Sequence, residues 1–154
     1  MRTLCLYYSR TELTRKAMER LAELTGADIC EYTDGKDRSG VLGYIGACIV
    51  SYKKNLPRIT IKGDPDLASY DRVIIGMPVW AEKPCAVGRA LISQYRGELP
   101  EDVRYVITHN AKADYASGIS GLDSLLGRPS KGYLSVRTKN NDYLKEIETY
   151  AATL

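Results

Sequence analysis

The stretch Tyr8–Thr14, with the sequence YSRTELT, marks the junction between two kinds of sequence pattern in this chain. The preceding run Arg2–Tyr8 is short and mostly apolar, as a buried parallel strand would be. From Arg15 onward apolar residues recur at spacings of three and four, and Gly26 stands where a glycine would end a helix. The stretch is therefore predicted to be a turn that joins a strand to a helix.

A turn in this position is suited to bind an anion. The first backbone N–H groups of a helix have no acceptor within the helix, and the helix dipole adds positive potential there. Ser9, Thr11 and Thr14 place three hydroxyl groups within six residues. Such hydroxyls often only cap the helix, but this number of them favours a phosphate-binding turn.

Length and charge limit the classes of protein to consider. The 154 residues are predicted to form one domain, residues 1–154, because no linker or repeat divides them. No apolar run is long enough to cross a bilayer and no leader pattern opens the chain, so we expect a cytoplasmic protein without membrane contact. The net charge is +3 and the basic residues are scattered among acidic ones, so nucleic acid is not an expected partner.

The cysteines and the single histidine do not predict a metal site. The four cysteines lie far apart, which argues against zinc and fits reduced thiols. They are Cys5, Cys30, Cys48 and Cys85. Cys85 follows Pro84 in the first turn of a predicted helix, where a thiolate would be stabilised, although packing is the preferred interpretation.

Strand-like and helix-like stretches alternate along the chain. The predicted strands are Arg2–Tyr8, Asp28–Tyr32, Arg72–Gly76, Val103–Thr108 and Gly132–Val136. The predicted helices run from Arg15 to the Gly26 stop, from about Val41 to Lys54, from Pro84 to Tyr95, from Ile119 to Leu126, and onward from Asn141. Five strands alternating with five helices predict an α/β fold, a parallel sheet covered on both faces. Ligands of such sheets bind at the carboxyl ends of the strands.

Two further loops are expected at that edge of the sheet. Met77–Ala81, MPVWA, contains the only tryptophan, and Trp80 offers a flat apolar face for a planar ligand unless it folds back onto the core. Thr108–Tyr115, THNAKADY, is long and polar, and Tyr115 could close over a heterocycle. Histidine is a common acid or base in catalysis, but a structural role is the preferred interpretation of His109, and no catalytic residue is assigned.

A phosphate turn followed by two aromatic loops describes a mononucleotide site for a flat ring. At these residues the chain resembles the flavodoxin family, whose phosphate loop reads S/T-x-T-x-x-T and whose second loop often carries P-x-W. The resemblance covers nearly the whole chain. It implies a flavodoxin-like three-layer sandwich, with a five-stranded parallel sheet of order 2-1-3-4-5 and helices on both faces. Flavodoxin is itself the usual example of this topology, so FMN as the cofactor comes from the resemblance.

The resemblance also implies which residues contact FMN. Those expected at the phosphate are Ser9, Arg10, Thr11, Leu13 and Thr14. Those expected beside the isoalloxazine ring are Pro78, Val79, Trp80 and Ala81 on one side, and Thr108, His109, Asn110 and Tyr115 on the other. The segment Asp37–Tyr44 is similar to one in small bacterial flavodoxin-like proteins of unassigned role. The fifth strand has no inserted loop, as in the short-chain form.

One residue of the phosphate turn departs from the family pattern. Many relatives carry Gly-Asn or Gly-Thr where this chain has Glu12-Leu13. A carboxylate near a phosphate is repulsive unless it points outward or pairs with Arg10 or Arg15. Because Glu12 lacks the freedom of glycine, the turn is also predicted to avoid positive φ at this position.

The resemblance implies an FMN-binding electron-transfer protein whose partner is a redox protein or a small acceptor such as a quinone. The charge leaves an alternative open, an FMN-dependent NAD(P)H or quinone oxidoreductase, because electron shuttles of this family are usually strongly acidic. A second alternative is a non-catalytic interaction module that has lost flavin binding. A tyrosine phosphatase of low molecular weight is excluded, because only four residues separate Cys5 from Arg10. The sequence does not determine the oligomeric state.

Overall fold

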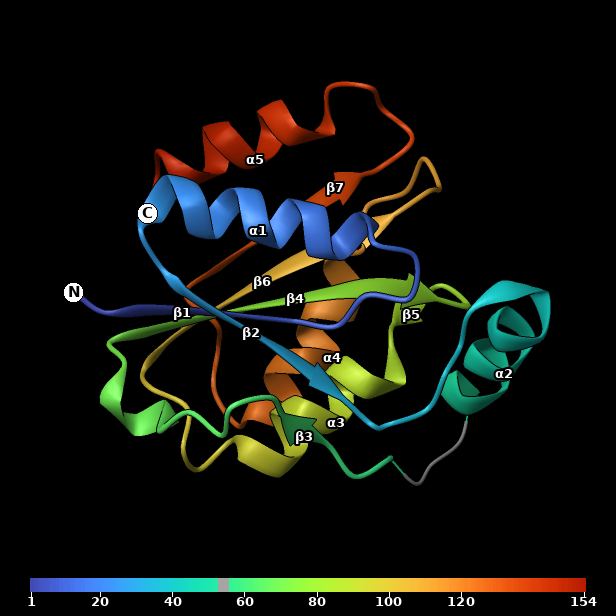
Figure 1. Ribbon diagram of the computed structural model, residues 1–154, viewed down its shortest axis with the longest axis horizontal. Coiled ribbons are helices and arrows are strands. Elements are labelled where there is room, and N and C mark those ends of the chain that lie inside the picture. The colour runs from blue at the N-terminus through green and yellow to red at the C-terminus, as the bar shows by residue number, and fades with distance from the viewer. Residues whose placement is uncertain (53–55) are drawn as a thin grey trace.

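A twisted, mostly parallel sheet forms the middle layer of the computed structural model, which describes residues 1–52 and 56–154 (Figure 1). Its long strands are β1 (Thr3–Tyr7), β2 (Asp28–Thr33), β4 (Arg72–Trp80), β6 (Asp102–His109) and β7 (Gly132–Arg137). They lie in the order β2-β1-β4-β6-β7, and every neighbouring pair among them is parallel. The predicted α/β class and the 2-1-3-4-5 order are confirmed.

Two short antiparallel strands correct the predicted number of strands. The sheet has seven strands, not five, because β3 (Thr60–Ile61) pairs with β2 and β5 (Lys83–Pro84) pairs with β4. Each is only two residues long, which is too short to give a pattern of alternating hydrophobicity.

Helices cover both faces of the sheet (Figure 1). One layer contains α1 (Leu13–Thr25) and α5 (Tyr143–Ala151), and the other contains α3 (Ala86–Tyr95) and α4 (Ala116–Leu126). A short 3₁₀ helix, η1 (Leu67–Ser69), precedes β4. Helix α1 begins two residues before the predicted start and α4 three residues before. Helix α3 begins after Pro84, which belongs to β5.

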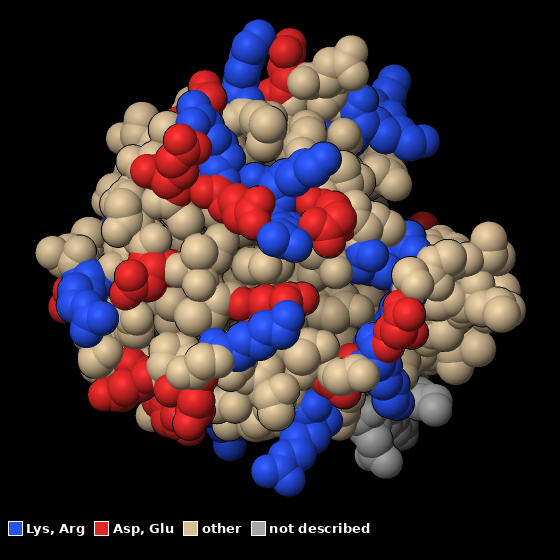
Figure 2. Space-filling view, in the orientation of Figure 1, with Lys and Arg blue, Asp and Glu red and all other residues tan. Residues whose placement is uncertain are grey.

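Helix α2 (Gly40–Tyr52) projects from one end of the sheet (Figure 1). It contains no charged residue, and Val41 and Leu42 on it are more than three quarters exposed. In Figure 2 this end is free of the acidic and basic side chains that alternate over the rest of the visible face. The last two residues predicted for this helix, 53 and 54, lie outside the described residues. No helix in the described part of the chain is long and apolar enough to cross a bilayer.

The core consists of two apolar layers because successive side chains of each strand point to opposite faces. Leu4 and Leu6 of β1 pack in the layer under α3 and α4. Cys5 and Tyr7 pack in the layer under α1 and α5. Side chains of the central strands are buried on both faces of the sheet, so the loops at the strand ends are attached to a packed core.

Strand β4 is longer than predicted. It pairs with β6 as far as Pro78 and Thr108, and then continues to Trp80 by pairing with β5. The segment Met77–Ala81, expected to be a loop, is therefore mostly strand. The turn that follows holds Ala81 and Glu82 at φ angles of 48° and 63°, as a tight hairpin turn requires.

Gly76 in β4 allows α1 to pack closely, which provides a test of the core. A Cβ atom at this position would lie 2.4 Å from Cγ of the buried Met18. We expect Gly76→Ala to lower the free energy of unfolding by about 1–3 kcal/mol in urea denaturation. Gly121→Ala in α4 is the control, since its Cβ would meet nothing within 4 Å. Equal stability of the two variants would contradict this packing.

Candidate functional site

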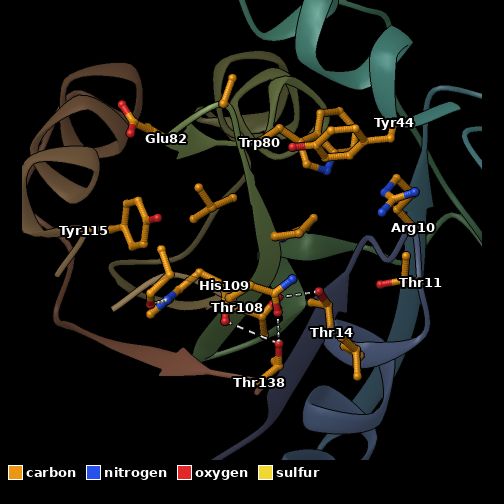
Figure 3. Close-up of a pocket in the computed structure, with 16 residues that line it drawn as sticks. Arg10, Thr11, Thr14, Tyr44, Trp80, Glu82, Thr108, His109, Tyr115 and Thr138 are labelled. Atoms are coloured by element: carbon orange, nitrogen blue, oxygen red, sulfur yellow. Dashed lines mark hydrogen bonds between the residues drawn. The ribbon is translucent and has the colours of Figure 1, made fainter. Parts of the chain in front are cut away.

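A cavity of about 280 Å³ opens at the carboxyl ends of β1, β4 and β6 (Figure 3). It brings together every predicted site residue except Ser9. Those lining it are Arg10, Thr11, Leu13, Thr14, Pro78, Val79, Trp80, Ala81, Thr108, His109, Asn110 and Tyr115. It is also lined by four residues that the sequence analysis did not assign, namely Tyr44, Glu82, Ala111 and Thr138.

The first turn of α1 forms one end of the cavity. The residue before this helix, Glu12, makes no capping hydrogen bond with its side chain. The helical ladder starts with the Lys16 N–H, which donates to the Glu12 carbonyl at 2.9 Å. The earlier amides therefore have no acceptor within the helix. The side chain of Glu12 therefore leaves these amides uncapped.

The hydroxyl groups of the turn have different surroundings. Thr14 is buried, and its hydroxyl lies 2.6 Å from that of Thr108, which ties α1 to the end of β6. Ser9 does not line the cavity, and its buried hydroxyl has no hydrogen-bond partner among the described residues. Thr138 donates to the amide oxygen of Asn110 at 3.0 Å, which fixes the rim of the cavity. Thr11 and Thr14 are thus the hydroxyl residues that face the cavity at this end.

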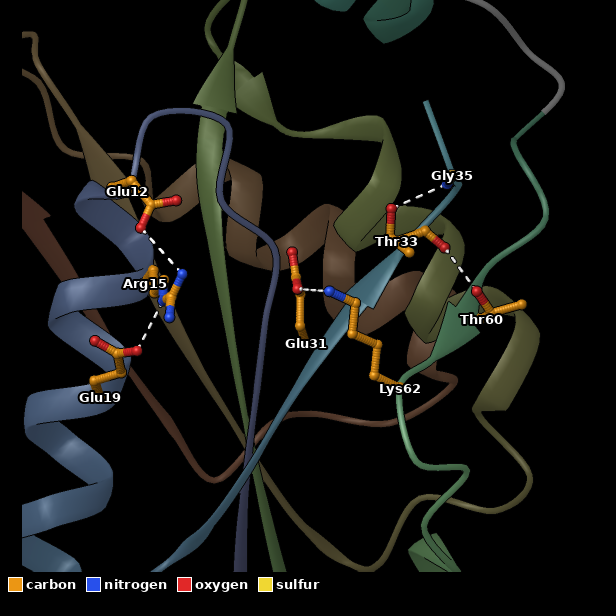
Figure 4. A network of polar contacts seen from close by, with 8 residues as sticks. All are labelled: Glu12, Arg15, Glu19, Glu31, Thr33, Gly35, Thr60 and Lys62. Carbon is orange, nitrogen blue, oxygen red and sulfur yellow. Dashed lines mark hydrogen bonds and ion pairs between the residues drawn. The ribbon is translucent and has the colours of Figure 1, made fainter. Parts of the chain in front are cut away.

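Glu12 points away from the cavity. Its carboxylate pairs with Arg15 at 3.3 Å, and Arg15 also pairs with Glu19 at 2.8 Å (Figure 4). The condition for tolerating an acidic residue here, outward orientation with an arginine partner, is met. The prediction that the turn avoids positive φ at this position is wrong, however, because Glu12 has a φ angle of 65°. The turn keeps a left-handed conformation although its residue is not glycine.

Trp80 folds back onto the core instead of exposing a flat face. It is 2 % exposed, and the Tyr8 ring meets it edge-on at a centroid distance of 5.5 Å. The guanidinium carbon of Arg38 lies 5.3 Å from the centre of the indole ring. Burial raises the pKa of Tyr8, while the same guanidinium opposes that rise. Trp80 still lines the cavity, but it does so packed against Tyr8, and these two rings are called the aromatic wall of the cavity below.

Tyr44 of α2 is the exposed aromatic residue of the cavity. Its side chain comes from the uncharged helix, and the Arg10 guanidinium carbon lies 5.3 Å from its ring centre. The segment Asp37–Tyr44 had a family likeness, which was the signal that could have identified this residue. Pattern alone could not, because a tyrosine in an apolar helix usually indicates packing.

His109 has structural contacts at both ring nitrogens. One nitrogen lies 3.0 Å from the Ala111 carbonyl oxygen and the other 3.0 Å from the Ser135 hydroxyl. Its ring packs on Tyr115 at a centroid distance of 4.8 Å. Burial, followed by the nearby Glu82 carboxylate, raises the pKa of Tyr115. The favoured structural role of His109 agrees with these contacts.

Cys85 is a packing residue. It is fully buried, and its sulfur accepts the Gly88 N–H at 3.3 Å at the start of α3. Burial raises the pKa of the thiol to about 12, more than the helix amides lower it. The described residues contain no group of His, Cys, Asp and Glu side chains that could hold a metal ion.

The charges of the cavity are separated. Of the described residues that line it, only Arg10 and Glu82 carry a formal charge, and Figure 3 shows them on opposite sides. Arg10 stands at the end formed by the turn before α1, and Glu82 stands at the hairpin turn after β4. The site can therefore orient a ligand that has an anionic end and a neutral end.

Comparison with known proteins identifies the fold. No family model and no curated protein matches the chain. A flavoprotein in complex with FMN from Lactobacillus acidophilus NCFM superimposes with a TM-score of 0.74 at 22% identity, over 97% of this chain and 98% of that chain. A putative flavoprotein from Bacteroides eggerthii superimposes with a TM-score of 0.77 at 18% identity, over 99% of this chain and 96% of that chain. A WrbA-like flavodoxin from Agrobacterium tumefaciens superimposes with a TM-score of 0.62 at 12% identity, over 99% of this chain and 93% of that chain.

These three structures superimpose on nearly the whole of this chain. The chain has the flavodoxin-like fold, as the sequence resemblance implied.

The left-handed conformation of Glu12 provides a test of the turn. We expect Glu12→Gly to raise the free energy of unfolding by up to about 1 kcal/mol, because glycine adopts positive φ without strain. Glu12→Ala is the matched control, since it removes the same carboxylate but keeps the strain. The check is urea denaturation of both variants, and equal shifts would contradict a strained turn.

Proposed function

We propose that this protein binds FMN and transfers electrons. The observation that carries the proposal is the cavity itself, in which an uncapped helix start, two threonines and one arginine face an aromatic wall. The cavity lies at the carboxyl ends of the strands next to the switch in strand order, where this topology binds its ligands. The similar flavoprotein from Lactobacillus acidophilus was obtained in complex with FMN.

The phosphate end is assigned from charge and donors. The first-turn amides of α1, the hydroxyls of Thr11 and Thr14 and the guanidinium of Arg10 would hold the phosphate. With Glu12 paired to Arg15 outside the cavity, the only carboxylate among the described lining residues is Glu82 on the far side. Electrostatics therefore favour one orientation of the nucleotide.

The ring end is assigned from the remaining lining residues. Tyr44 and Trp80 would flank the ring system on one side, and the loop that ends at Tyr115 would flank it on the other. FMN, when bound, supplies one-electron and two-electron chemistry. The protein would exclude water and set the charge around the ring, and the negative charge of Glu82 at this side of the cavity would disfavour an anionic form of the cofactor. No side chain of the cavity has to act as nucleophile or base.

Two roles share this site. In the first, the protein is a shuttle whose partner is a redox protein; in the second, it is a small oxidoreductase that reduces a quinone or another small acceptor with NAD(P)H. The slightly basic net charge of +3 favours the second role over a typical acidic shuttle. Oxidation of NAD(P)H by the isolated flavin-loaded protein would support the enzyme, and reduction only by a separate reductase would support the shuttle.

We propose a subcellular location for the protein from the state of its cysteines. The described cysteines are all unpaired, which supports a reducing compartment such as the cytoplasm.

The first test is the visible spectrum of the purified protein after addition of excess FMN and removal of unbound ligand. We expect bands in the blue and near ultraviolet, and release of FMN on denaturation. Riboflavin, which lacks the phosphate, is expected to bind more weakly by about tenfold or more, the worth of one charged hydrogen bond. A colourless protein would overturn FMN binding and favour the interaction module.

Arg10→Met tests the phosphate assignment. We expect the Kd for FMN to rise by about tenfold or more and the Kd for riboflavin to stay nearly constant, because only FMN carries the charge that Arg10 pairs with. Lys131→Met is the matched control, since it changes the net charge equally but pairs with Glu101 at the opposite edge of the sheet. Equal weakening of both flavins by Arg10→Met would contradict the assignment.

A further inference from the structure

A buried ion pair lies immediately behind the aromatic wall of the cavity. Two nitrogens of the Arg38 guanidinium lie 2.7 and 2.6 Å from the two carboxylate oxygens of Asp34. The two side chains are 5% and 1% exposed. Removing two charges from water is costly even when they are paired, and such a pair stabilises a fold little more than apolar residues would. Its position suggests a different role.

The guanidinium of Arg38 contacts the cavity through Trp80. It lies over the indole ring at 5.3 Å from its centre, on a residue that lines the cavity. Because the two-point contact with Asp34 fixes the plane of the guanidinium, it also fixes the side of Trp80 that packs against it. Tyr8 restrains the same ring edge-on.

The backbone of Arg38 contacts the phosphate end of the cavity. Its carbonyl oxygen accepts a hydrogen bond of 3.5 Å from the Arg10 guanidinium. Arg10 in turn lies over the ring of Tyr44. One residue outside the cavity therefore touches Trp80 with its side chain and Arg10 with its backbone.

Helix α2 is seated on the same backbone. A Cβ atom added at Gly43 would lie 2.1 Å from the Arg38 carbonyl carbon and 2.2 Å from its oxygen. Only glycine permits this approach, which places the neighbouring Tyr44 at the cavity. The family-like segment Asp37–Tyr44 thus contains both Arg38 and the glycine that packs on its backbone.

We infer that Arg38 is a positioning residue that holds Trp80, Arg10 and Tyr44 in the arrangement that receives the flavin. This inference rests on the proposed FMN site. Arg38 does not line the cavity and contributes no net charge, because Asp34 balances it. Burial by itself raises the pKa of Asp34, but the hydrogen bonds and charge of Arg38 outweigh it, so the pKa of Asp34 is lowered and the carboxylate stays ionised.

The single tryptophan allows the inference to be tested without any flavin. Trp80 is the only source of indole fluorescence, so emission of the flavin-free protein reports its surroundings directly. We expect Arg38→Met to shift this emission to longer wavelength, because loss of the guanidinium loosens the wall and admits water. We also expect the Kd for FMN to rise by about tenfold, as for loss of one charged contact. Arg38→Lys, which keeps the charge but not the two-point contact, should give intermediate values.

The control is a second ion pair, partly buried and far from the cavity, whose carboxylate Asp102 also pairs with Arg104. Arg72 and Asp102 stand at the starts of β4 and β6, with Nε 2.7 Å from the carboxylate and the Arg72 side chain 8% exposed. Arg72→Met should lower stability in urea but leave Trp80 emission and the Kd for FMN within about twofold of the original values. This separates positioning from general stability.

A shift of emission and affinity with Arg38→Met but not with Arg72→Met supports the inference. Unchanged emission with Arg38→Met, or the same shift with Arg72→Met, overturns it. If Arg38→Met does not fold, Gly43→Ala decides, since displacing the Arg38 backbone should shift the emission and a constant emission would overturn the inference. If the unaltered protein fails to bind FMN, the proposed function fails, while Trp80 emission still tests the role of Arg38.

Discussion

Parallel pairing of β4 with both of its neighbours is the constraint on which the site depends. Tyr7 of β1 stands beside Gly76, and Thr108 of β6 stands beside Pro78, so three strands end at one edge of the sheet. The turn before α1, the hairpin after β4 and the loop after β6 are therefore brought together by the backbone before any side chain is considered. Close packing of Met18 over Gly76 holds α1, and with it the turn before this helix, against this edge.

The turns beside the cavity contain residues with unusual backbone angles and two acidic side chains. Glu12, Ala81 and Glu82 are non-glycine residues at positive φ, and all three stand in turns at the cavity. Such conformations persist only where the surrounding structure determines them, and they are common at ligand sites. The carboxylate of Glu12 pairs outward with Arg15, while Glu82 stands on the side of the cavity opposite Arg10. The chain thus keeps an acidic residue in the turn before α1 while its carboxylate points away from the cavity.

Much of the fold followed from local patterns, and the errors have physical causes. Apolar runs identified the five long strands because buried parallel strands are apolar on both faces. The extension of β4 to Trp80 was missed because it depends on a two-residue partner, β5, that gives no pattern. Tyr44 was missed because its place at the cavity depends on Gly43 packing against the backbone of Arg38, a contact that leaves no periodic pattern in the sequence. The burial of Trp80 was not predicted because it depends on contacts with Arg38 and Tyr8, which are far from it in the sequence.

The central claim is that the start of α1 holds a phosphate dianion. Its most direct test is a pH titration of the ³¹P NMR signal of FMN added to the protein. A free phosphate monoester titrates with a second pKa of about 6. Because amide donors, the helix dipole and Arg10 all favour the dianion, we predict that the signal of bound FMN stays unchanged between about pH 5 and 8. A bound signal that titrates like free FMN would contradict the claim.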